Sequence, residues 1–296
     1  MIRLFGVFAF ILGAVWGILS LLDPRSDYIA EKILWQATQR LSFASKNPEA
    51  VPDRDFEQIA AQYQKVIKDF PNSRLVPSAY FFLGNLYSVK KDYETARGML
   101  GEICPKYPGN ASLCSEASAN IAKTFELEGN WSEALKVYQG IEKAYPLSDL
   151  GLTIPLYIAN YYARYSHTVN AQEAFAEAAA HYRKLSAEHP NSEVELKALK
   201  LLSGCYLVQK NWKEATAALA EILNKYPNSQ LVVPTSQAID SITLTESKDF
   251  DAAITIYRDF IAKNPKHPLE KHFQETIQTF EKLKSKKTSE TETRKS

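Results

Sequence analysis

Three cysteines are the residues of this chain whose type and spacing could support redox chemistry. Cys104 and Cys114 flank a Tyr-Pro-Gly-Asn turn at residues 107–110, where their side chains could approach one another. In an oxidising compartment such a pair can form a disulfide that closes a short loop. We therefore regard Cys104 and Cys114 as a candidate disulfide, with two independently packed thiols as the alternative. Cys205 is expected to serve as a small buried hydrophobic residue.

The remaining chemistry-bearing residues do not form a recognisable catalytic or metal site. The histidines show neither an H-E-x-x-H pair nor cysteine neighbours at zinc spacing; they are His167, His181, His189, His267 and His272. Glu173 and Glu177 lie at helical spacing, which is common on solvated helix faces, and no Gly-rich phosphate loop is present. The sequence therefore predicts no enzyme, no metal ion and no cofactor.

A repeated pattern organises most of the chain. Each copy begins with an aromatic residue, has small or apolar residues three and seven positions later, and reaches a proline fifteen positions later. The aromatic residues are Phe56, Tyr93, Trp131, Phe175, Trp212 and Phe250. The prolines are Pro71, Pro108, Pro146, Pro190, Pro227 and Pro265, at spacings of 37, 38, 44, 37 and 38 residues. Such a period indicates one structural unit copied along the chain.

Each copy reads as a hairpin of two amphipathic helices. Offsets of three and seven place the apolar residues on one face of a helix, and the proline ends that helix because it disfavours helical geometry in the preceding residue. A partner helix lies between each proline and the next aromatic residue, as in the Leu83-Gly84 segment that precedes Tyr87. About thirteen helices result. Five polar residues are predicted to cap second helices: Asp55, Asp92, Asn130, Asn211 and Asp249.

This pattern resembles the tetratricopeptide repeat (TPR), whose hairpin carries Leu-Gly, Tyr, Ala and a final Pro at these offsets. The resemblance covers residues 26–285 and implies an all-α, right-handed α-solenoid of about six TPR-like hairpins, closed by a C-terminal capping helix. That last helix would carry the stripe Leu269, Phe273, Thr276, Ile277, Phe280 and Leu283. Two copies depart from the pattern: the fourth has seven extra residues around 165–171, and the sixth has Asp240-Ser241 in place of Leu-Gly.

The resemblance also implies where a partner binds. In TPR proteins the first helix of each hairpin lines a concave wall along which a peptide lies. Here the residues beside the packing positions of those helices are Phe81, Asn85, Ser88, Lys123, Asn160, Arg164, Lys197 and Lys200. Amides can pair with an extended backbone and cations can hold carboxylates, so acidic extended segments are the expected partners. The pattern lacks the Lys-Asn-Asn-Lys-Arg clamp by which some relatives hold a C-terminal carboxylate.

The N-terminal segment differs in character from the repeats. Leu4 to Leu22 is nineteen residues without a charge, enough to span a bilayer core of about 30 Å. We expect an uncleaved transmembrane signal anchor over residues 4–22, behind a short head at 1–3. A cleaved signal peptide and a buried helix are the alternatives. Residues 286–296 are rich in Lys, Ser, Thr and Glu and are predicted to form a disordered tail.

These features favour an interaction protein. The formal net charge of +1 gives no general reason to bind nucleic acid. The expected function is a membrane-anchored TPR scaffold that mediates protein–protein interactions, with its repeats on the periplasmic side of a bacterial inner membrane. The repeat length and the Tyr-Pro-Asn-Ser junctions resemble periplasmic TPR proteins of the outer-membrane-assembly and Tol-Pal-associated groups. The alternatives are a cytosol-facing, membrane-tethered adaptor for a chaperone or translocation machine, and a small-ligand carrier or enzyme that uses the solenoid hollow.

Overall fold

The structure is helical throughout the residues that it describes. In the computed structural model of the chain, these residues are 24–44, 52–165 and 168–293. The helices are α2 (Pro24–Ala44), α3 (Asp53–Asp69), α4 (Val76–Val89), α5 (Tyr93–Gly101), α6 (Ile103–Lys106), α7 (Ala111–Leu127), α8 (Trp131–Ala144), α9 (Asp149–Arg164), α10 (Thr168–Glu188), α11 (Glu193–Val208), α12 (Trp212–Lys225), α13 (Val232–Ser241), the π-helix η2 (Ile242–Ser247), α14 (Phe250–Lys263) and α15 (Glu270–Thr293). Counting α5 with α6 and α13 with η2 as single interrupted helices, the described residues form thirteen helices. The all-α prediction is confirmed.

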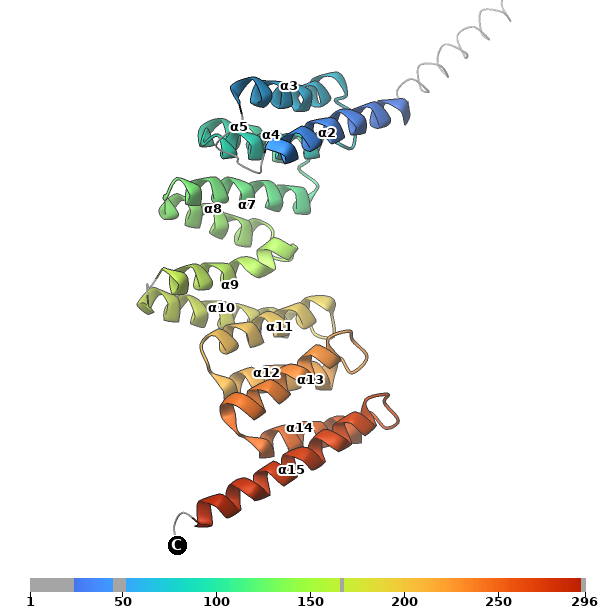
Figure 1. Cartoon of the computed structure of the whole chain (residues 1–296), viewed down its shortest axis with the longest axis vertical. Coiled ribbons are helices and arrows are strands. Elements are labelled where there is room, and N and C mark those ends of the chain that lie inside the picture. Colours follow the sequence, from blue (N-terminus) through green and yellow to red (C-terminus); the bar gives the residue numbers. More distant parts are fainter. Residues whose placement is uncertain (1–23, 45–51, 166–167, 294–296) are drawn as a thin grey trace, which may run out of the picture. The chain divides into compact units, whose positions relative to one another are not determined.

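The chain divides into two compact units, Met1–Leu150 and Gly151–Ser296. Figure 1 shows helices α2 to α8 in the first unit and the main part of α9 to α15 in the second. The sequence predicted one continuous repeat domain over residues 26–285, whereas the structure separates the repeats near the start of the fourth hairpin. Each unit is therefore described by itself.

The first unit is a stack of helical hairpins. Helices that follow one another in the sequence pack together, and α5 and α6 also contact α7. One core cluster joins α2, α3 and α4 around Tyr63 and Leu83, both fully buried. A second cluster joins α4 and α7 to the α5–α6 helix around Leu100 and Ile103. The hydrophobic core is thus divided between neighbouring hairpins, as expected for a solenoid.

The second unit has one continuous core that α15 closes. Helices α9 to α15 all contribute to this core. The ring of Phe273 on α15 stacks on that of Tyr257 at a centroid distance of 4.7 Å, and Phe280 and Ile277 are also buried. The predicted closing stripe is confirmed at these three positions, while Leu283 is 37% exposed. Helix α15 continues to Thr293, so residues 286–293 are helical where a disordered tail was predicted.

The predicted proline stops are confirmed in all six copies. Every second helix ends one residue before the aromatic, His or Asn residue that precedes the proline; these end residues are Asp69, Lys106, Ala144, Glu188, Lys225 and Lys263. The seven extra residues of the fourth copy lengthen α10, which has 21 residues where α8 and α12 have 14. The insertion is accommodated mainly as additional helix.

Three of the five predicted caps are confirmed. The side chains of Asp92, Asn130 and Asp249 each accept a hydrogen bond from the backbone N–H three residues later, at 3.1–3.3 Å. Asn211 occupies the N-cap position of α12 but its side chain makes no capping hydrogen bond, so that prediction is wrong. The Asp55 prediction is also wrong, because α3 already begins at Asp53, directly after Pro52.

A buried tyrosine joins the two helices of four hairpins. Its hydroxyl hydrogen-bonds to the first helix of the same hairpin in every case: Tyr63 with Thr38, Tyr138 with Glu126, Tyr182 with the Leu152 carbonyl, and Tyr257 with the Ser236 carbonyl. A buried phenol needs such a partner because an unmet hydroxyl costs about 1–3 kcal/mol. The tyrosine therefore fixes each hairpin by packing and by hydrogen bonding together.

The predicted membrane anchor, residues 4–22, lies outside the described residues. Among the helices that the structure does describe, none has both the length and the apolar composition needed to cross a bilayer. The anchor stays a prediction from the sequence.

Candidate functional site

The first helices of the hairpins present a polar residue at a repeated position. In α4, α7 and α9 this residue is exposed and directly follows a small, fully buried one. The exposed residues are Asn85, Lys123 and Asn160, behind Gly84, Ala122 and Ala159. A helix that packs through a small residue approaches its neighbour closely, so the next side chain is directed away from the contact. This geometry explains why these three predicted residues reach solvent.

Four of the eight predicted wall residues make contacts within the fold. Phe81 is half-buried and packs on the cluster around Tyr80 and Leu100, so it belongs to the core more than to an open wall. The Ser88 hydroxyl donates to the carbonyl of Gly84. Two cations form ion pairs within their own helices, Lys123 with Glu126 at 2.5 Å and Lys197 with Glu193 at 3.1 Å.

The eight residues are divided between the two units. Phe81, Asn85, Ser88 and Lys123 lie in the first, and Asn160, Arg164, Lys197 and Lys200 lie in the second. Within the second unit, α9 and α11 pack closely, since a Cβ atom added at Gly204 would lie 3.5 Å from Cδ2 of Leu156. The structure thus brings Asn160 and Arg164 onto a helix that packs beside the one carrying Lys197 and Lys200.

The exposed side of α9 is the most distinctive surface of the second unit. Tyr157, Tyr161 and Tyr165 recur every four residues, so they follow one side of the helix, with Asn160 and Arg164 on the same side. Tyr157 is 38% exposed and Tyr165 is 56% exposed. The rings of Tyr161 and Tyr165 lie 4.5 Å apart between centroids. We call these five residues the α9 face.

The chemistry of the α9 face suits protein recognition. Tyrosine offers a large flat apolar area with a polar end and few rotatable bonds, and Tyr and Arg are enriched at protein interfaces. Arg164 is exposed and forms no ion pair within the described residues, so its five N–H donors can reach a carboxylate or carbonyl. The sequence analysis named Asn160 and Arg164 but missed the tyrosines. The four-residue spacing of Tyr157, Tyr161 and Tyr165 is the signal that would have found them.

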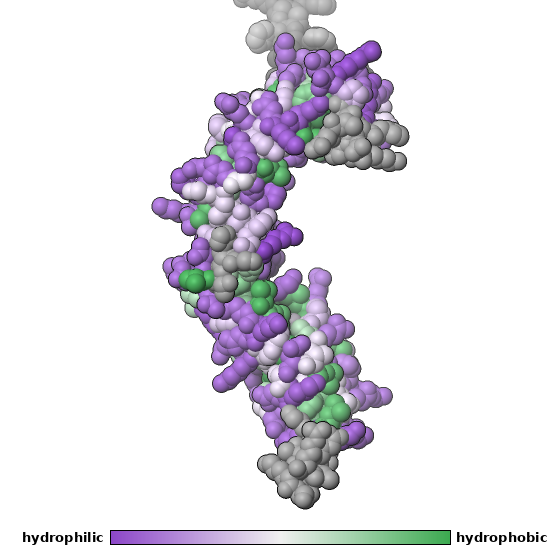
Figure 2. Space-filling view, turned by 60° about the vertical axis from the view of Figure 1, so that its left-hand side comes forward, coloured by the Kyte–Doolittle hydropathy of each residue, from purple (hydrophilic) through white to green (hydrophobic). Residues whose placement is uncertain are grey.

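No broad apolar docking surface competes with it on the side of the molecule drawn in Figure 2. Hydrophilic side chains predominate there, and hydrophobic ones gather in small separate patches. Elsewhere in the described residues, the largest exposed aromatic side chains are Tyr28 and Trp35 on α2, at 67% and 63% exposure.

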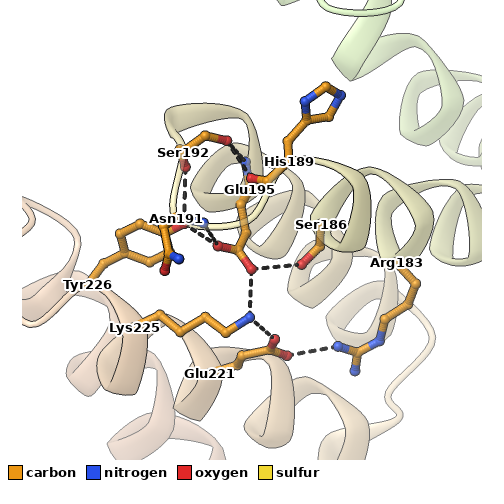
Figure 3. A network of polar contacts seen from close by, with 9 residues as sticks. All are labelled: Arg183, Ser186, His189, Asn191, Ser192, Glu195, Glu221, Lys225 and Tyr226. Carbon is orange, nitrogen blue, oxygen red and sulfur yellow. Dashed lines mark hydrogen bonds and ion pairs between the residues drawn. The ribbon is translucent and has the colours of Figure 1, made fainter.

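A buried carboxylate in the second unit looks like a catalytic group but is fully paired. Glu195 is 1% exposed and accepts four hydrogen bonds (Figure 3). Its donors are the Ser186 hydroxyl at 3.3 Å, the Asn191 backbone N–H at 2.6 Å, the Lys225 ammonium at 2.6 Å and the Tyr226 hydroxyl at 2.5 Å. Because every donor is already satisfied by the protein, this group joins α10, α11 and α12.

The electrostatics of this network follow from its contacts. Burial alone would raise the pKa of Glu195, but the hydrogen bonds from Lys225, Tyr226 and Asn191 outweigh it, and the pKa lies below its ordinary value. Burial, followed by the hydrogen bond to Glu195, raises the pKa of Tyr226 to about 12. The Ser192 hydroxyl also accepts from the Glu195 backbone N–H at 3.2 Å. The spacing Ser192-x-x-Glu195 is a capping-box pattern that the sequence analysis overlooked.

The structure joins Cys104 and Cys114 in a disulfide, with their Cα atoms 5.0 Å apart. That separation lies in the range that a disulfide spans. Cys205 is a buried thiol, and burial raises its pKa to about 12. The redox state of the pair in the cell stays a prediction.

The described residues hold no group of three or more His, Cys, Asp or Glu side chains that could bind a metal ion. His267 has a local structural role: its Nδ1 accepts from the Leu269 backbone N–H at 3.1 Å, and its Nε2 lies 3.0 Å from the Pro227 carbonyl oxygen.

The comparisons identify the repeat. Residues 117–148 and 170–232 match family models described as tetratricopeptide repeat. The chain contains tetratricopeptide repeats. The matched segments cover α7 with α8, and α10 to α12, where the hairpin pattern was read from the sequence. The more specific resemblance to periplasmic TPR proteins is not established by these matches. No curated protein sequence matches the chain.

Solved structures with similar folds include the following three. BtubC (BKLC) from P. vanneervenii is 14% identical, with 88% of this chain and 91% of that chain covered and a TM-score of 0.36. The TPR2AB domain of yeast Sti1, solved in a complex with pHSP90, is 13% identical, with 86% and 99% covered and a TM-score of 0.34. A tetratricopeptide repeat protein from Parabacteroides merdae ATCC 43184 is 10% identical, with 85% and 98% covered and a TM-score of 0.37. At these TM-scores we draw no functional conclusion from them.

Proposed function

We propose that this chain is a TPR scaffold that binds partner proteins or peptides through the α9 face and the neighbouring first helix α11. The tetratricopeptide repeat is a protein-interaction fold, and the α9 face is the observation that carries the proposal. It combines exposed tyrosine rings with an amide and an unpaired guanidinium, the composition that interface centres favour. Arg164 and Lys200 favour a partner segment that bears carboxylates.

We further propose that residues 4–22 anchor the protein as a single span in a bacterial inner membrane, with the repeats in the periplasm. The nineteen uncharged residues and the resemblance to periplasmic TPR proteins of the outer-membrane-assembly and Tol-Pal-associated groups support this location. The anchor would confine the scaffold to the envelope without contributing to partner contact.

Photo-crosslinking from the α9 face tests the binding proposal. A photoreactive phenylalanine analogue placed at Tyr165 in the full-length protein should capture discrete partners in cells. The same probe at Tyr28 is the matched control, since Tyr28 is also an exposed tyrosine on a first helix. Arg164→Glu should abolish the Tyr165 products, because it opposes an acidic partner with like charge. Capture of the same proteins from both positions, or capture that survives Arg164→Glu, would contradict the proposal.

Fractionation tests the location separately. Removing residues 1–22 should release the protein from the membrane while the Tyr165 crosslinks persist in lysate. Protease added to spheroplasts should digest the repeats of the full-length protein if they are periplasmic. Protection of the repeats from that protease would instead place them in the cytosol.

A further inference from the structure

A second surface in the second unit has the features of a binding site. A cleft of about 820 Å³ lies between the N-terminal halves of α12 and α14, and Thr243 and Ser247 of η2 also line it. This volume is in the range of known ligand sites. The cleft is formed by the second helices of two hairpins, so it is separate from the α9 face. We call it the α12–α14 cleft.

Small side chains on α12 create the α12–α14 cleft. On α10 and α14 the residue eight positions after the repeat aromatic is an arginine that reaches the following helix: Arg183 pairs with Glu221 at 2.8 Å, and Arg258 with Glu281 at 2.6 Å. The same position on α12 is Ala220, which lines the cleft together with Ala217. Alanine cannot bridge to α14, so the space that arginine crosses in the neighbouring hairpins stays open.

The unpaired charges at the cleft are positive. Lys210 and Lys213 line it beside the N-terminus of α12, and neither forms an ion pair within the described residues. The facing carboxylates are occupied: Asp249 accepts from the Ala252 backbone N–H at 3.1 Å, and Asp251 pairs with Lys284. The positive end of the α12 dipole adds to the two lysines, because Asn211 leaves the N-terminus without a side-chain cap.

The inner wall of the cleft carries a hydroxyl that lacks a partner. Thr243 is 1% exposed, lines the cleft, and its side chain forms no hydrogen bond within the described residues. A buried hydroxyl without a partner costs stability unless a ligand or water supplies one. Thr243 lies in η2, and π-helical turns are frequent at functional sites. This hydroxyl is a second indication of a ligand, independent of the helix N-terminus.

We infer that the α12–α14 cleft binds an extended partner segment in which an Asp or Glu side chain stands next to an apolar one. The carboxylate would lie against Lys210, Lys213 and the N-terminus of α12. The apolar side chain would pack on Trp212 and the alanine wall, and the segment's backbone would meet Thr243. An internal acidic side chain is the committed source of the carboxylate.

An array of short peptides tests this inference. Each peptide alternates Glu or Asp with Leu, Val or Phe, and is N-acetylated and C-amidated so that no terminal carboxylate is present. The full-length protein in detergent should bind members of this array at least tenfold more tightly than the matching Gln or Asn peptides. Raising the salt concentration should weaken binding, because the pair is partly exposed.

Two variants locate the binding. Ala217→Trp fills the cleft and should reduce affinity at least tenfold, as should Lys213→Glu. Ala180→Trp is the matched control, because Ala180 is an exposed alanine at the same repeat position on α10. It should leave binding unchanged, and circular dichroism should show equal helicity for all three proteins. Absence of binding, equal affinity for the Gln and Asn peptides, or binding insensitive to Ala217→Trp would overturn the inference.

Discussion

The hydroxyl of Tyr257 donates a hydrogen bond to Oδ1 of Asp240 at 2.6 Å. Asp240 is the residue at which the sixth hairpin departs from the Leu-Gly pattern of the repeat. The other buried tyrosines bond to a backbone carbonyl, a threonine or a glutamate of their own hairpin, and Tyr257 bonds to both a carbonyl and this carboxylate. The unusual aspartate is therefore part of the bonding that holds α14 to α13.

The Asp240 carboxyl should make stability depend on pH. Burial raises its pKa, while the Tyr257 hydrogen bond and His272 oppose the shift without cancelling it. The folded state thus favours the protonated form, so its contribution is present below the unfolded pKa of about 4 and is lost as pH rises through the folded pKa. Asp240→Asn should raise the thermal midpoint at pH 7, and the gain should vanish near pH 3. A gain of equal size at both pH values would contradict this account, and Tyr257→Phe serves as a control that removes only the donor.

Glu195 should show the opposite dependence. Its pKa is lowered overall, so its contribution is present above the unfolded pKa and is lost as pH falls through the folded pKa. Glu195→Gln should destabilise the protein by about 1–3 kcal/mol at pH 7, because a carboxylate acceptor of four donors is lost. Thermal unfolding should show a smaller difference at pH 3. Glu193→Gln is the control, since that side chain is 78% exposed and its ion pair should contribute less than about 1 kcal/mol. Equal effects of the two variants would refute the assigned role.

Two helical glycines should respond differently to alanine. At Gly84 an added Cβ would lie 2.7 Å from Cγ of the buried Leu100, so Gly84→Ala should cost about 1–3 kcal/mol. At Gly204 the nearest atom is 3.5 Å away, an ordinary contact. Gly204→Ala should therefore be neutral or raise stability by up to about 1 kcal/mol, the difference in helix propensity. Chemical denaturation of both variants checks the pair, and a Gly84→Ala protein as stable as the parent would show that Leu100 can move aside.

The cysteines should differ in reactivity. If the Cys104–Cys114 pair is oxidised in the cell, both thiols should resist alkylation in protein isolated without reductant and should react after reduction. Cys205 should react only on unfolding, because burial keeps it a neutral thiol at pH 7. Mass spectrometry of the alkylated protein measures all three. Immediate labelling of Cys104 and Cys114 would show that the pair is reduced.

The sequence predicts the helices well because their determinants are local. Each stop depends on a proline and its preceding residue, and each core position depends on spacing within one helix. The cap at Asn211 fails because capping also requires a particular side-chain rotamer, which residue type does not specify. Polar wall residues such as Asn160 were predictable, since they follow a small buried residue in every clear copy.

The sites depend on comparisons between hairpins and were harder to foresee. The α12–α14 cleft exists because Ala220 stands where Arg183 and Arg258 stand in the adjacent second helices, a difference visible only once the helices are aligned in space. Glu195 was missed because a carboxylate usually lies at the surface, and its burial requires donors from three helices. The division near Leu150 has no composition signal in the repeat itself.

Helix α15 also limits how this array can have grown. Its buried side is committed to Tyr257, Phe260 and their neighbours through Phe273 and Phe280, while its opposite side is charged and exposed. A hairpin duplicated after α15 would meet that charged surface and would have no apolar face on which to pack. Gene duplications that lengthen this protein should therefore be inserted upstream of α15, with the closing helix retained at the C-terminal end.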